Sequence, residues 1–218
     1  MEGFTKKGLR LLGALPGYDK DRFTAEKTDY QRLLAEPAKA FVDALGPRLA
    51  SSVSPGIEWS AKTNGSISPI NNDLRFKPDA PPYKDHLLVK FWEGPAKRTA
   101  PTLWVRIGAK DVGFASGVAP ADVDVWRKVV DSDDGSGIAD AIDRLVAATG
   151  AEVVGRDLKR VPAPYPADHP RADLLRHKWL QVRWIGDVDA ASEAFVEACA
   201  DQLAEAGDLH RRLVAAFA

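Results

Sequence analysis

Apolar residues in the first quarter of the chain repeat at the spacing of helices. Thr5 is placed to cap a first helix, whose apolar residues recur at every third position until Pro16 ends it. A second helix is predicted over residues 21–34. A third is predicted from Pro37, because proline suits the first turn of a helix.

Alternation of apolar and polar residues replaces this spacing in the middle of the chain, and alternation is typical of strands. The three clearest strands are joined by short polar links. This favours an antiparallel meander, because parallel strands need long crossovers. The strands predicted in this part cover residues 57–61, 66–70, 87–92, 102–107 and 112–116.

The last hundred residues return mostly to helical spacing. The predicted elements are a helix from Pro120, a loop over 131–137, a helix from Ile138, strands over 151–154 and 179–184, and a final helix capped by Asp189 with a kink at Gly207. Helices at both ends and strands in the middle predict an α+β fold. We expect a central, mostly antiparallel sheet with N-terminal and C-terminal helices packed on one face. Residues 1–218 are expected to form a single domain.

Composition narrows the class of protein without assigning a function. The chain has 30 basic and 31 acidic residues, mixed along its length, and a net charge of −1. This argues against a dedicated nucleic-acid binder, which usually has a basic excess. The single cysteine, Cys199, allows no disulfide within the chain. No run approaches the roughly 20 apolar residues that span a bilayer, so we expect a cytoplasmic protein without membrane contact.

Residues 71–86 form the most informative segment. It is long and lacks periodicity, and such loops in compact domains are often functional. Arginine grips a carboxylate or phosphate in a fork, whereas lysine supplies a point charge. The alternative is a solvated connection held by its aromatic residues. The groups that could converge on an anion are Arg75, Lys77, Lys84 and His86, and the expected anchors are Leu74, Phe76 and Tyr83.

A second irregular segment covers residues 158–170. Its prolines stiffen the chain, so that it can present side chains at low entropic cost. In the simpler interpretation, Asp168 or His169 caps a helix that begins at Pro170. For Asp168 taken alone we favour that structural role. The polar residues of the segment are Lys159, Arg160, Asp168 and His169.

Other kinds of chemistry find little support. The four histidines and the lone cysteine show no metal-binding spacing, and neither a nucleophile elbow nor a glycine-rich phosphate loop is present. We therefore expect no metal site and no cofactor. Cys199 lies in an apolar helical stripe and is interpreted as a core residue. The six tryptophans are interpreted mainly as core residues, although alternation turns some to the opposite sheet face, where one or two could line a pocket.

Several short motifs occur in an order that resembles one family. They are Gly3-Phe4, Phe23…Lys27…Tyr30, Ala44-Leu45-Gly46-Pro47-Arg48-Leu49, Asp73-x-Arg75-Phe76 with Asp79, Pro82-Tyr83-Lys84, Leu158-Lys159-Arg160, Tyr165, Asp168-His169-Pro170 and Leu174…Lys178. Over nearly its whole length the chain resembles the uncharacterised bacterial and fungal family called domain of unknown function 2461. The resemblance implies a fold and an important loop, and it implies no activity.

The chain departs from that family inside the first irregular segment. The family loop usually reads Arg-Asp-x-Arg-Phe-Ser-x-Asp-Lys-Thr-Pro-Tyr-Lys. Two cationic positions are lost here and one is gained nearby, so an anion gripped by this loop would be held differently. The differences are Asn72 for the first arginine, Lys77 for the serine, Ala80 for the lysine and Pro81 for the threonine.

The leading hypothesis is a small-molecule binding protein or an enzyme whose anionic ligand, bearing phosphate or carboxylate, is held by residues 71–86. Arg75 and Lys84 would neutralise charge, while Tyr83 and His86 would orient the ligand or move a proton. If the two irregular segments meet in space, the site is completed by Lys159, Arg160, Asp168 and His169.

Two other classes of protein stay open. One is a protein-interaction or regulatory module without catalysis, in which the same charges rim a binding surface. The other is a weak nucleic-acid binder, which the near-zero net charge disfavours. A deep pocket containing Arg75 and Lys84 would favour the first hypothesis, and a flat apolar patch rimmed by them would favour the interaction module.

Overall fold

The N-terminal part of the chain is helical, as predicted. The computed structural model describes residues 3–75 and 78–217. Thr5 caps the first helix by accepting a hydrogen bond of 3.0 Å from the backbone N–H of Gly8. The predicted helix over 21–34 is divided into shorter pieces, and a π-helical turn joins it directly to the next helix. These elements are α1 (Lys6–Ala14), a 3-10 turn (Leu15–Gly17), α2 (Lys20–Ala25), α3 (Lys27–Tyr30), the π-turn (Gln31–Ala35) and α4 (Glu36–Ser52).

Within the described residues, five strands form one antiparallel sheet in the order β1-β2-β3-β5-β4. The strands are β1 (His86–Trp92), β2 (Thr102–Gly108), β3 (Val112–Val118), β4 (Glu152–Arg156) and β5 (His177–Gly186). The predicted meander and the α+β class are confirmed. The strands predicted over 57–61 and 66–70 are wrong. Only isolated bridges, Glu58 to Trp92 and Ile67 to Val89, tie that part of the chain to the edge of β1.

The later helices are α5 (Val123–Asp131), α6 (Asp133–Thr149), α7 (Ala172–Leu175), α8 (Phe195–Ala204) and α9 (Gly207–Phe217). The helix expected from Pro120 starts later, because the carboxylate of Asp122 accepts from the N–H of Asp124 and caps it. The loop expected over 131–137 is wrong as well. Only Ser132 separates α5 from α6, whose first turn carries two aspartates that suit the positive end of a helix.

The start of the final helix also differs from the prediction. Asp189 accepts from the N–H of Ala191 in a preceding turn, so it does not cap α8. Gly207 is the first residue of a new helix and not a kink within one.

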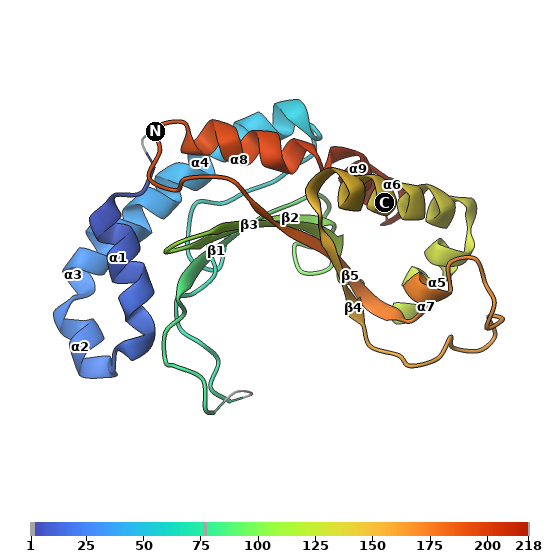
Figure 1. The fold of residues 1–218 in the computed structure, drawn as a ribbon, viewed down its shortest axis with the longest axis horizontal. Coiled ribbons are helices and arrows are strands. Elements are labelled where there is room, and N and C mark those ends of the chain that lie inside the picture. The colour runs from blue at the N-terminus through green and yellow to red at the C-terminus, as the bar shows by residue number, and fades with distance from the viewer. Residues whose placement is uncertain (1–2, 76–77, 218) are drawn as a thin grey trace.

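The long helices α4, α6, α8 and α9 lie over one face of the sheet (Figure 1). We call the opposite face the open face, because no helix covers it in the part of the chain that the structure describes. The core lies between the sheet and the helices, and includes Val89, Val105 and Val182 of alternate strand positions. No helix among the described residues is long and apolar enough to cross a membrane.

Candidate functional site

Residues at matching positions of successive strands form a row across the open face. Lys90 pairs with Trp104, and Trp104 pairs with Ala115. Ala115 pairs in turn with Arg183, which pairs with Glu152 at the far edge. Side chains alternate between the two faces of a strand, so this row and its neighbours two positions away point away from the helices.

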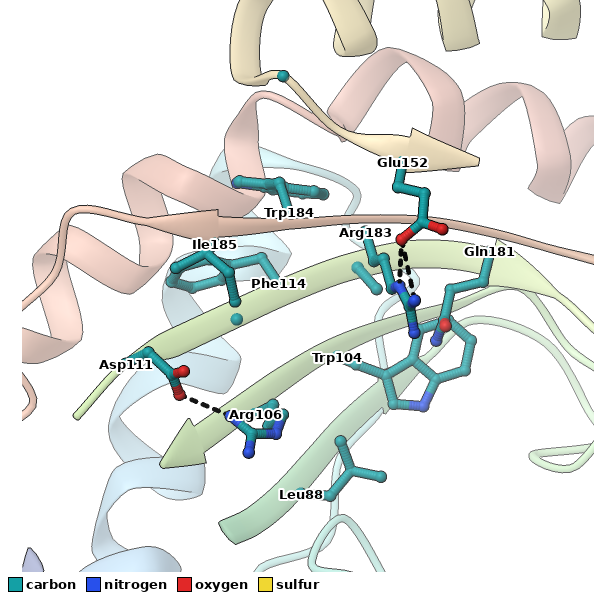
Figure 2. Close-up of a pocket in the computed structure, with 13 residues that line it drawn as sticks. Leu88, Trp104, Arg106, Asp111, Phe114, Glu152, Gln181, Arg183, Trp184 and Ile185 are labelled. Carbon is teal, nitrogen blue, oxygen red and sulfur yellow. Dashed lines mark hydrogen bonds and ion pairs between the residues drawn. The ribbon is translucent and has the colours of Figure 1, made fainter. Parts of the chain in front are cut away.

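A cavity of about 690 Å³ lies on this face. Its floor is made by Gly113, which has no side chain, and Ala115, which has only a methyl group, so the middle of β3 lies low. Ligand pockets usually measure about 300–1,000 Å³, so the hollow is large enough for a metabolite-sized molecule. The residues that line it come from all five strands or their ends, and Figure 2 labels Leu88, Trp104, Arg106, Asp111, Phe114, Glu152, Gln181, Arg183, Trp184 and Ile185.

Arg106 is the centre of a polar network at one side of the cavity. Its guanidinium donates to the carboxylate of Asp111 at 2.6 Å and lies 3.5 Å from that of Asp85. Asp85 in turn accepts a hydrogen bond of 2.6 Å from Nδ1 of His86. The bond from His86, and then the charge of Arg106, hold the pKa of the Asp85 carboxyl below its usual range. This network fixes the direction of the guanidinium before any ligand arrives.

Arg183 stands on the other side of the cavity. Its Nε and one terminal nitrogen donate to the same carboxylate oxygen of Glu152, at 3.1 and 2.9 Å. The dashed lines in Figure 2 mark this pair and the pair of Arg106 with Asp111. A guanidinium has five N–H donors, so each arginine keeps donors for a further acceptor while its carboxylate positions it.

The structure gives most predicted residues of the 71–86 segment a structural partner. The ammonium of Lys84 donates to the carbonyls of Pro69 and Asn71, and burial lowers its pKa. Tyr83 is buried and stacks on Phe23 with ring centres 4.2 Å apart, so it anchors the loop as predicted.

The remaining predicted residues of this segment do not share one environment. Arg75 is exposed and forms an ion pair of 2.7 Å with Asp73. Leu74, expected to be an anchor, is 40% exposed. Phe76 and Lys77 lie outside the described residues. His86 begins β1 and reaches the cavity region through Asp85 and Arg106.

The second predicted segment is irregular, as expected, but its polar residues do not form one site. Lys159, Arg160 and Asp168 are exposed. His169 accepts from the N–H of Arg171 through Nδ1, so its Nε2 carries the proton that is donated to Asp131 at 3.1 Å. These bonds hold the segment against α5, which is a structural role.

The described parts of the two irregular segments do not meet. They extend on opposite sides of the sheet (Figure 1), and β1 and β4 beside them are its outer strands. A combined site of Arg75 and Lys84 with Lys159 and Arg160 is therefore not formed.

The sequence prediction missed the open-face residues Arg106, Gln181 and Arg183, although a signal for them was present. Each occupies an alternate position in a strand whose intervening residues are apolar, which directs it to the other face. The order of the strands, which places β5 beside β3, could not be read from this alternation.

The sequence predicts no metal site, and the structure adds one observation on this point. In the described ranges, no group of three or more His, Cys, Asp and Glu side chains is arranged to hold a metal ion.

Comparison with known families identifies the relatives of the chain. Residues 18–211 match the family described as conserved hypothetical protein (DUF2461). The chain belongs to this family. The match includes β1 to β5, and therefore every strand that builds the cavity in this DUF2461 protein. No curated protein and no solved structure matches the chain.

Proposed function

We propose that the protein binds a small molecule carrying a carboxylate or phosphate group, and that the ligand lies in the cavity on the open face. The observation that carries this proposal is the cavity of about 690 Å³ with Arg106 and Arg183 on its two sides. The class of ligand is the one that the sequence predicts, while its place differs from the predicted loop.

The arginines suit an anion because they are already oriented. Each is held by at least one carboxylate, so binding requires little further loss of side-chain freedom. Arginine also contacts carboxylate and phosphate groups in a bidentate manner, which adds direction to charge. An anion that bridges part of the cavity would therefore meet donors from two sides.

The 71–86 loop supports this site more than it forms one. Lys84 directs its ammonium to two backbone carbonyls, and the ring of Tyr83 is covered by Phe23. His86 is the predicted residue that stays within reach of the chemistry, because Asp85 links it to Arg106. The one cysteine, buried in α8, is in keeping with a cytoplasmic location.

The test is a thermal-shift screen of the purified protein against nucleotides, sugar phosphates and carboxylates, followed by calorimetric titration of each hit. A ligand at 100 times its Kd adds about 2.7 kcal/mol to stability. We expect hits that Arg106→Gln weakens by about tenfold or more, the size expected when one charge-assisted contact is lost.

The matched control is Arg144→Gln. Arg144 also pairs with a carboxylate, that of Asp208 at 2.6 Å, but on the outer surface of α6. This variant should bind every hit as the unaltered protein does. If Arg106→Gln left the affinity of a hit unchanged, that ligand would bind elsewhere. A screen without hits would favour the interaction module. The exposed Trp179 and Ile185 of β5 would then be part of its binding surface.

A further inference from the structure

Lys90 is a half-buried cation at the border of the cavity. Its partner in the register is Trp104, which lines the cavity, and Leu88 on the same strand and face lines it too. Directly paired residues in an antiparallel sheet have Cβ atoms about 4.5–5.5 Å apart. Lys90 therefore stands one strand beyond Trp104 on the open face.

The ammonium of Lys90 has no hydrogen bond or ion pair with another residue in the described part of the chain. Two comparable lysines differ in this respect. Lys84 donates to the carbonyls of Pro69 and Asn71, and Lys97 donates to those of Asn64 and Gly65. A bound anion would give this ammonium an ion-pair partner that the described residues do not supply.

The charges around Lys90 favour an anion as that partner. Burial, and after it the positive charge of Lys97, lower the pKa of the Lys90 amine. No carboxylate of the described residues contributes to this shift. Inside the cavity, by contrast, Arg106 and Arg183 are each balanced by an acid. The excess of positive charge on this side of the open face thus lies at Lys90 and Lys97.

Aromatic surface surrounds the same position. Trp92 lies two residues after Lys90 on the same face, and the ammonium of Lys97 is 5.5 Å from the centre of its ring. Trp104 adds its indole on the cavity side, above a floor of Gly113 and Ala115 that leaves room for a flat group. Aromatic rings bind planar ligands through offset or edge contacts.

We propose that the ligand is an aromatic ring joined to a phosphate or carboxylate. The ring packs against Trp104 over the floor of β3, and the anionic group contacts the ammonium of Lys90. This inference rests on the proposed function, because it places the ring in the same cavity, and it adds the class of the ligand and a second anion contact.

The test uses two charged aromatic probes, adenosine monophosphate and benzoate, each beside its uncharged counterpart, adenosine and benzamide. Titrations followed by tryptophan fluorescence compare the unaltered protein with Lys90→Gln. The matched control is Lys128→Gln, an exposed lysine on α5 that removes the same charge. Circular dichroism confirms that each variant is folded.

We expect at least one charged probe to bind, and Lys90→Gln to weaken it by about tenfold, while Lys128→Gln changes its Kd by less than about twofold. The uncharged counterparts should bind more weakly, and their Kd should be the same for the unaltered protein and for Lys90→Gln. An anion contact at Lys90 would be overturned if a charged probe bound equally well to Lys90→Gln.

Failure of this inference is distinguishable from failure of the proposed function. If a non-aromatic anion such as glycerol 3-phosphate bound in an Arg106-dependent manner and neither aromatic probe did, the cavity would be the site and the aromatic class would be wrong. If no probe bound in an Arg106-dependent manner, both the proposed function and this inference would be overturned. A single-stranded oligonucleotide that bound far more tightly than adenosine monophosphate would replace the small ligand with a nucleic acid.

Discussion

At the scale of single residues, Ala115 controls the depth of the cavity. It lies between Trp104 and Arg183 in the row across the open face. We expect Ala115→Leu to fill the space above β3 and abolish binding of any cavity ligand, at a cost in stability of at most about 1–3 kcal/mol. Titration and thermal unfolding measure the two effects. Ala25→Leu, at the exposed end of α2, is the control for adding the same side chain elsewhere. Unchanged binding in Ala115→Leu would place the ligand away from β3.

Whether a predicted site residue is available to a ligand depends on its hydrogen-bond partners in the fold, and the sequence does not show those partners. Lys84 and His86 are two positions apart in one predicted loop. The fold directs Lys84 to the carbonyls of Pro69 and Asn71, whereas His86 begins a strand and bonds to Asp85. Charge and residue type alone made the two equivalent candidates, and only the path of the backbone separates them.

At the scale of elements, strands with apolar residues on one face were predictable and boundaries set by polar side chains were not. The three strands of the meander were found to within a residue or two because alternation defines them. The start of α5 depends on which residue caps it, Asp122 and not Pro120. The segment 57–70 alternates like a strand, yet it makes only single bridges with β1, because pairing requires a partner that the local pattern does not supply.

The contact between α9 and the end of β1 predicts a pH dependence. His210 is fully buried, bonds to Glu93 at 3.1 Å, and its Nδ1 has no partner among the described residues. Burial lowers the pKa of His210, opposed by the carboxylate of Glu93 and aided by Arg211. A histidine whose folded pKa is lowered binds its proton more readily in the unfolded chain. Its contribution to stability is therefore complete above the unfolded pKa of about 6.5 and is lost as the pH falls through the folded value.

Melting temperatures measured from pH 8 to pH 5 test this expectation. The unaltered protein should lose stability below about pH 6.5, and His210→Leu should lose less over the same interval, because it removes the proton acceptor. Glu93 keeps the hydrogen bond from Ser54 in that variant. His177, whose pKa is also lowered chiefly by burial, remains in both proteins and cancels in the comparison. Parallel curves would show that His210 is not the source of the dependence.

At the scale of the whole molecule, the proposed function depends on an uneven distribution of helices. The long helices gather on one face of the sheet (Figure 1), and the other face carries the residues that line the cavity. The N-terminus is part of the same body, because the N–H groups of Gly3 and Phe4 donate to the carbonyls of Ser192 and Ala190. A rigid sheet held in this way can present fixed arginines to a ligand, which a flexible loop does less well.

The prediction of a single domain is tested by the cooperativity of unfolding. Phe4 is buried against Phe41 of α4 and Phe195 of α8, with ring centres 6.5 and 5.9 Å away, so it joins the two ends of the chain. Phe4→Ala should destabilise the protein by about 3–5 kcal/mol, or roughly 10 °C in melting temperature for a chain of this length.

All six tryptophans lie between residues 59 and 184, whereas much of the helical signal comes from the two ends. Far-ultraviolet circular dichroism and tryptophan fluorescence therefore report on different parts of the chain. If the core is continuous, both signals shift together in Phe4→Ala, because loss of the N-terminal contact is felt by the sheet. If the helical signal melted first while the fluorescence kept its original midpoint, the N-terminal helices would be a separate unit. The arginines of the open face would then be held by the sheet and the C-terminal helices alone.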